Sequence, residues 1–161
     1  MNINQLLEQE YKICENDDKI ATIGCSLAHN DDYTHWEGTM LGPTDSPYAG
    51  GIFYIDIFFP PDYPAHGPEF KFKNYIYHLN VEKETGHICL SRLNQWKTQG
   101  YVDNYLNYNV SQALVDIFYL FYDQGTMSPH NENMSYLYLN NREEFDKNVK
   151  ECVQKSLKNS P

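Results

Sequence analysis

The stretch that decides the fold is IFYIDIFFPPDYPAHGPEFKFKN, residues Ile52–Asn74. It opens with a run of β-branched and aromatic residues, which is typical of a strand. Four prolines and a glycine then interrupt the run between residues 60 and 68. The following EFKFK alternates apolar and polar residues, the period of a half-buried strand. The stretch therefore predicts two strands joined by a proline-rich turn.

The residues before this stretch extend the pattern toward the amino end. Apolar residues at helical spacing predict a short amphipathic helix over residues 3–14. Two further β-prone segments follow, residues 20–28 and residues 33–41. A Gly- and Pro-rich loop over residues 42–51 separates them from Ile52. We therefore expect a four-stranded antiparallel meander.

The period of the sequence changes after the sheet. Residues 94–109, NQWKTQGYVDNYLNYN, have no clear apolar period and are predicted to form an exposed loop, with an insertion near residues 97–109. Residues 110–124 and residues 141–157 each place apolar side chains on one face, which predicts two helices. Strands followed by helices indicate a single α+β domain over residues 1–161.

The composition narrows the range of partners. The 161 residues include 12 Lys and Arg against 22 Asp and Glu, a formal net charge of −10 at pH 7. A protein that binds nucleic acid or an anionic membrane needs the opposite sign, so neither is expected as a partner. The charge suits proteins with basic faces. We see no apolar run typical of a signal peptide or a membrane span, so the predicted location is the cytoplasm, the nucleus or both.

The four cysteines, Cys14, Cys25, Cys89 and Cys152, are widely spaced and form no C-x-x-C pair. We therefore expect free thiols, no structural metal site and no cofactor. Cys14, Cys25 and Cys152 lie in apolar or helical patterns, and we interpret them as buried hydrophobic residues.

Cys89 follows the polar, turn-like segment EKETGH, and three interpretations compete for it. A buried apolar residue would lie on a regular element, and a metal ligand would need partners at short spacing. A nucleophile would need activation, because an ordinary thiol has a pKa of about 8.5. His78 or His87 could serve as the base of a Cys–His hydrolase, although no orienting acid can be placed beside either.

A series of motifs in a fixed order surrounds Cys89. It comprises Gly42-Pro43, Ser46-Pro47-Tyr48, Gly50-Gly51, Phe59-Pro60, Tyr63-Pro64, Tyr77-His78, Asn80, Gly86, Ile88-Cys89-Leu90 and Trp96. With these motifs the chain resembles the ubiquitin-conjugating enzyme family over nearly its whole length. The resemblance implies that family's fold: an amino-terminal helix, a four-stranded antiparallel meander, an active-site loop and carboxy-terminal helices.

The resemblance also implies a reaction and its partners. Cys89 would accept ubiquitin or a ubiquitin-like protein from an activating enzyme as a thioester, and pass it to a lysine of a substrate protein, usually with a ligase. Asn80 would donate a hydrogen bond to the oxyanion or support the loop, or cap its own backbone as a turn residue. His78 and Tyr77 are expected to hold the turn. Ser128 would gate the cleft, or serve only as a turn or cap residue.

Two departures from the family pattern lie beside the expected site. Leu79 stands where the family usually has proline, so the backbone angle φ is not fixed there. The segment over residues 80–89 is slightly longer than usual, which could shift Asn80 relative to the thiol. These departures leave an alternative open: a noncatalytic member of the same fold that binds ubiquitin or acts as a scaffold. Thioester formation on Cys89 separates the two.

Overall fold

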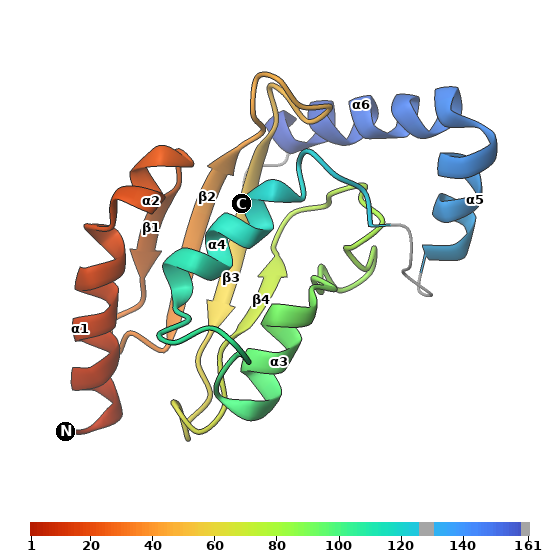
Figure 1. Ribbon diagram of the computed structural model, residues 1–161. Helices are drawn as coiled ribbons and strands as arrows, with labels where there is room; N and C mark the ends of the chain where they lie inside the picture. Colours follow the sequence, from red (N-terminus) through yellow and green to blue (C-terminus); the bar gives the residue numbers. More distant parts are fainter. Residues whose placement is uncertain (126–130, 159–161) are drawn as a thin grey trace.

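The computed structural model describes residues 1–125 and 131–158. Within them a sheet lies between two helices at the amino end and further helices at the carboxyl end (Figure 1). The elements are α1 (Ile3–Glu15), α2 (Asp18–Thr22), β1 (Ser26–His29), β2 (His35–Leu41), β3 (Ile52–Phe58), β4 (Glu69–Phe72), α3 (Ser91–Gln99), α4 (Val110–Tyr119), α5 (Glu132–Asn140) and α6 (Arg142–Lys158). This order confirms the predicted α+β class.

The sheet is the predicted antiparallel meander, with strand order β1-β2-β3-β4. Its inner face is covered by α4 (Figure 1), and the close approach is made at Gly38. A Cβ atom at Gly38 would lie 3.7 Å from a methyl of Leu114 in α4. Trp36 and Ile57, paired across β2 and β3, are fully buried on this face. Burial of large apolar side chains here is the main source of the domain's stability.

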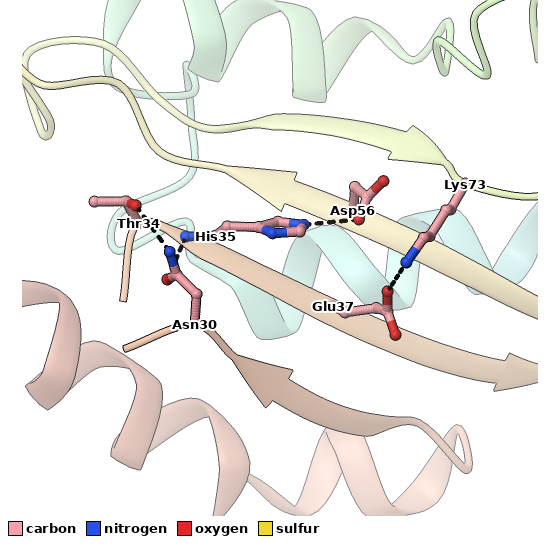
Figure 2. Close-up of polar contacts among 6 residues, drawn as sticks. All are labelled: Asn30, Thr34, His35, Glu37, Asp56 and Lys73. Carbon is pink, nitrogen blue, oxygen red and sulfur yellow. Dashed lines mark hydrogen bonds and ion pairs between the residues drawn. The ribbon is translucent and has the colours of Figure 1, made fainter. Parts of the chain in front are cut away.

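The opposite face of the sheet is partly exposed, as the alternation in β2 and β3 predicts, and it carries ion pairs among its side chains (Figure 2). His35 Nε2 lies 2.7 Å from Asp56 Oδ1, and Lys73 Nζ donates to Glu37 Oε2 at 2.8 Å. The first pair joins the neighbouring strands β2 and β3, and the second joins β2 to the residue after β4, across β3. They contribute little individually because they are partly solvated.

The start of the sheet differs from the prediction. Residues 20–28 are predicted as a strand, but α2 takes Asp18–Thr22 and β1 begins only at Ser26. The side chain of Asp17 caps α2 by accepting from the Lys19 backbone N–H. Gly24 then has φ +65, which lets the chain leave the helix. A helix of five residues is too short to show an apolar period. The β-branched residues of this segment therefore predicted a strand in its place.

The segment after Cys89 also differs from the prediction. Residues 94–109 are predicted as an exposed loop, but Asn94–Gln99 belong to α3. Leu93 and Trp96 lie three residues apart and bury one face of this helix. Gly100, with φ +79, ends it by donating its N–H to the Trp96 carbonyl. The irregular segment is therefore limited to residues 100–109.

Helices α1, α4 and α6 agree with the sequence pattern, whereas α5 was not predicted. α1 buries Leu7, Tyr11 and Cys14, and α6 buries an apolar face that includes Phe145 and Cys152. α6 packs against β3, and α3 against β4. None of the helices in the two described ranges combines the length and apolar character needed to cross a bilayer.

Candidate active site

Cys89 lies at the end of the segment that connects β4 to α3. Its backbone N–H donates to the Asn80 carbonyl at 2.7 Å, and the next residue, Leu90, is the N-cap of α3. The Cys89 side chain is partly exposed. Cys14, Cys25 and Cys152 are buried, which confirms the prediction for those three. Cys89 is therefore not an interior apolar residue.

A shallow depression adjoins Cys89 on the α4 side. It has a volume of about 300 Å³ and is lined by Leu90, Ser91, Arg92, Asp116 and Tyr119. The lining comes from the first turn of α3 and from the outer face of α4.

The side chain of Asn80 connects the Cys89 loop to the segment that follows α4. Its Nδ2 donates to the Cys89 carbonyl at 2.8 Å, and its Oδ1 accepts from the Gly125 N–H at 2.7 Å. A Cβ atom at Gly125 would lie only 2.0 Å from Asn80 Oδ1, so any side chain there would displace the carboxamide. These contacts are those of a loop-supporting residue. They also keep the carboxamide nitrogen beside the backbone of Cys89.

His78 is fully buried, and both of its ring nitrogens have backbone partners. Nδ1 accepts from the Asn80 N–H at 2.9 Å, and Nε2 donates to the carbonyls of Leu120 and Asp123 at 2.7 and 2.8 Å. Burial lowers the pKa of His78 to about 4, so the ring is neutral at pH 7. The ring hydrogen bonds expected of His78 are present, and neither nitrogen is oriented to act as a base for Cys89.

We expect the low pKa of His78 to make the domain less stable at mildly acidic pH. Between about 4 and the ordinary value of 6.5, the unfolded chain binds a proton that folded His78 does not. Stability is therefore full above pH 6.5 and falls as the pH drops, by about 2 kcal/mol between pH 7 and pH 5. Urea denaturation at the two pH values measures this difference in wild type and in His78→Gln.

The His78→Gln variant should be less stable at both pH values but should lose most of the difference between them. His66→Gln is the matched control, because His66 is an exposed histidine paired with Asp62. It should keep the wild-type difference. An equal pH dependence in wild type and His78→Gln would contradict the prediction.

Tyr77 and Leu79 hold the turn on either side of His78. Tyr77 packs its ring against Phe145 of α6, with centroids 5.2 Å apart. The Leu79 side chain is fully buried, and its N–H donates to Gln124 Oε1 at 2.9 Å. A proline at this position could not make that hydrogen bond. The turn is thus held by tertiary contacts where the family pattern relies on a fixed φ.

Two supporting residues, Gln124 and Asn131, were missed by the sequence reasoning. Gln124 also donates to the Tyr48 hydroxyl at 2.7 Å. Asn131 is buried, and its Nδ2 lies 3.0–3.3 Å from three carbonyls of the turn, those of His78, Leu79 and Val81. Neither residue stands in a recognisable motif, because each meets the turn from more than 40 positions away.

Gly86 shapes the loop between Asn80 and Cys89. It has φ +75, and a Cβ atom there would lie 2.0 Å from the Phe72 carbonyl oxygen. Its own carbonyl accepts from the Phe72 N–H at 2.9 Å, so the loop leans on β4 through this residue. Both the left-handed backbone and the close approach require glycine.

Gly86→Ala should lower the free energy of unfolding by about 2–4 kcal/mol, combining left-handed strain with steric overlap. Gly24→Ala is the matched control, because Gly24 has φ +65 but nothing within 4 Å of a Cβ atom. It should lose only about 1–2 kcal/mol. Urea denaturation compares the two variants. Equal losses would show that the contact with Phe72 is unimportant.

Ser128, the predicted gate residue, lies outside the described residues. His87, the second candidate base, lies two residues before Cys89 in an isolated bridge with Lys71. The structure therefore brings together Cys89, Asn80, His78 and Tyr77 around one turn.

Comparison with known proteins agrees with this geometry. Residues 6–153 match the family described as ubiquitin-conjugating enzyme. The structure is similar to the E2 domain of a ubiquitin-conjugating enzyme from Toxoplasma gondii, with a TM-score of 0.75 and 30% sequence identity. That match covers 92% of this chain and 97% of the other. The matched residues include the whole sheet, Asn80, Cys89 and α3. The chain belongs to the ubiquitin-conjugating enzyme family.

Proposed function

We propose that Cys89 carries ubiquitin or a ubiquitin-like protein as a thioester, and that the domain transfers it to a lysine of a substrate protein. The Cys89 thiolate attacks the thioester carbonyl that joins the modifier to its activating enzyme. A new C–S bond forms, and the activating enzyme's cysteine leaves as a thiolate. An incoming lysine amine then forms an amide bond with the same carbonyl carbon, and Cys89 is released. A ligase usually brings the substrate close.

The observation that supports this proposal most directly is the partly exposed position of Cys89 at the start of α3. Each acyl transfer passes through a tetrahedral oxyanion, which needs nearby donors. The amino-terminal end of a helix has a partial positive charge that favours such an anion. An amide nitrogen carries two hydrogens, and one hydrogen of Asn80 Nδ2 goes to the Cys89 carbonyl. We assign the second to the oxyanion.

The acceptor lysine must lose its proton before it attacks, because its ordinary pKa is about 10.4. Neutral His78, with both ring nitrogens engaged, is not the group that removes it. We propose that desolvation in the cleft lowers the lysine pKa at the moment of transfer.

The test is a charging assay with activating enzyme, ATP and ubiquitin, repeated in parallel with other ubiquitin-like proteins and their activating enzymes. We expect one modifier to give a conjugate that a thiol reductant removes on a denaturing gel. If no modifier charges the folded protein, the noncatalytic scaffold alternative replaces this proposal. Cleavage of a fluorogenic ubiquitin ester would instead favour a Cys–His hydrolase.

A further inference from the structure

Asp116 of α4 joins three segments that meet beside the Cys89 depression. Its carboxylate accepts from Arg92 Nη2 at 2.8 Å, from the Tyr108 hydroxyl at 2.7 Å and from Gln112 Nε2 at 3.2 Å. The Asp116 side chain is only 8% exposed, and that of Arg92 is 36% exposed. One largely buried carboxylate thus ties α3, α4 and the segment between them.

The contact with Arg92 matters because α3 is weakly supported at the end that follows Cys89. The helix has nine residues, and its N-cap, Leu90, makes no side-chain cap hydrogen bond. A helix this short is marginal by itself, so contacts with the rest of the domain must hold its first turn. Arg92 lies in that turn, and its ion pair with Asp116 fixes the turn to α4.

The contact with Tyr108 holds the segment between α3 and α4. Besides donating to Asp116, Tyr108 packs edge-on against Trp96, with ring centroids 5.1 Å apart. The guanidinium of Arg92 lies over the ring of Tyr105, with Cζ 4.5 Å from the centroid. Asp116 and Arg92 therefore anchor both the start of α3 and the segment between α3 and α4.

We propose that Asp116 is a positioning residue for the reaction at Cys89 and that it acts through Arg92, an inference that rests on the proposed function. A guanidinium bound to a carboxylate holds the two side chains in a restricted geometry. An amide in place of either partner does not impose that geometry. Without this contact the first turn of α3 shifts, and the Cys89 sulfur shifts with it. A displacement of about 1 Å slows reaction by as much as roughly a hundredfold.

The first experiment measures single-turnover discharge of the modifier from Cys89 to free lysine. Asp116→Asn and Arg92→Gln should each slow discharge by about tenfold, within the range for a misplaced reacting group. The double variant should be no slower than either single variant, because all three break the same contact. Saturating lysine should not restore the rate, since the maximal rate is lowered and the lysine KM is not raised.

A second readout does not depend on any modifier. Cys89 in the uncharged, folded protein is alkylated with iodoacetamide, and the rate is followed by mass spectrometry. Asp116→Asn and Arg92→Gln should raise this rate by about threefold or more, because the first turn of α3 no longer holds the thiol in place. Glu37→Gln is the matched control, since it breaks the Glu37–Lys73 ion pair on the outer sheet face (Figure 2). It should leave both rates unchanged.

The inference is overturned if folded Asp116→Asn shows wild-type rates of discharge and alkylation. It is also overturned if the effects of the two single variants multiply in the double variant. If Asp116→Asn does not fold, Arg92→Gln decides alone, since Arg92 is the more exposed partner. If the wild-type protein accepts no modifier, the proposed function fails, and alkylation still decides whether Asp116 positions Cys89.

Discussion

Cys89→Ala is expected to abolish charging by any ubiquitin-like protein, at least to the detection limit of a nonreducing gel. The alanine has no nucleophile, and the other described cysteines cannot take its place. Burial raises the pKa of Cys14 and Cys152 to about 11 and that of Cys25 to about 12. Their thiols therefore stay protonated at neutral pH, and they are also closed to a protein partner.

Two further variants make this result specific. Cys25→Ala should charge like wild type, because Cys25 is a buried thiol that lies beside Gly38, on the face of the sheet that α4 covers. Cys89→Ser should give, if any product, an ester that a thiol reductant does not remove, because oxygen replaces sulfur in the acyl bond. A reducible conjugate that persists in folded Cys89→Ala would place the nucleophile elsewhere and remove the proposed function.

The strands could be predicted from the sequence because alternation is a local signal. β2 and β3 bury every second residue in the core, so each strand shows its own period. α2 and α3 lack such a signal. α2 has five residues, and α3 has only Leu93 and Trp96 on its buried face, among polar neighbours that suggest a loop. α5 went unpredicted for the same reason, since Met134 is its one fully buried residue.

The site residues, too, could be predicted only where the signal is local in the sequence. Cys89, Asn80 and His78 could be placed because they fall within one short stretch of family motifs. The residues that hold them could not, because their partners lie far along the chain. Gln124 meets Leu79 across 45 positions, and Asp116 meets Arg92 across 24. Such pairings depend on the packing of α4 beside the turn and on no local pattern.

Leu79 illustrates how packing changes the meaning of a substitution. Taken alone, leucine in place of proline predicts a less preorganised turn, because φ is free. In the fold the Leu79 side chain is fully buried and its N–H bonds to Gln124. Asn131 adds hydrogen bonds to the turn carbonyls from the other side. The rigidity of the turn therefore comes from partners distant in sequence.

Asn80→Ala is expected to have the second-largest effect, a fall of about 100- to 1000-fold in the rate of transfer from charged Cys89. The variant removes the donor that we assign to the oxyanion. It also leaves the Gly125 N–H and the Cys89 carbonyl without this partner. The free energy of unfolding should fall by about 1–3 kcal/mol for that reason. Discharge kinetics and urea denaturation measure the two losses separately.

Gln124→Ala separates the two roles of Asn80. Gln124 supports the same turn through hydrogen bonds with Leu79 and Tyr48. It should lower stability by a similar amount, but slow transfer by less than about tenfold. If both variants slow transfer equally at equal loss of stability, Asn80 acts only by holding the loop. A much larger loss of rate in Asn80→Ala than in Gln124→Ala would instead show that the Asn80 carboxamide contacts the oxyanion. Loss of loop support would then account only for the smaller effect of Gln124→Ala.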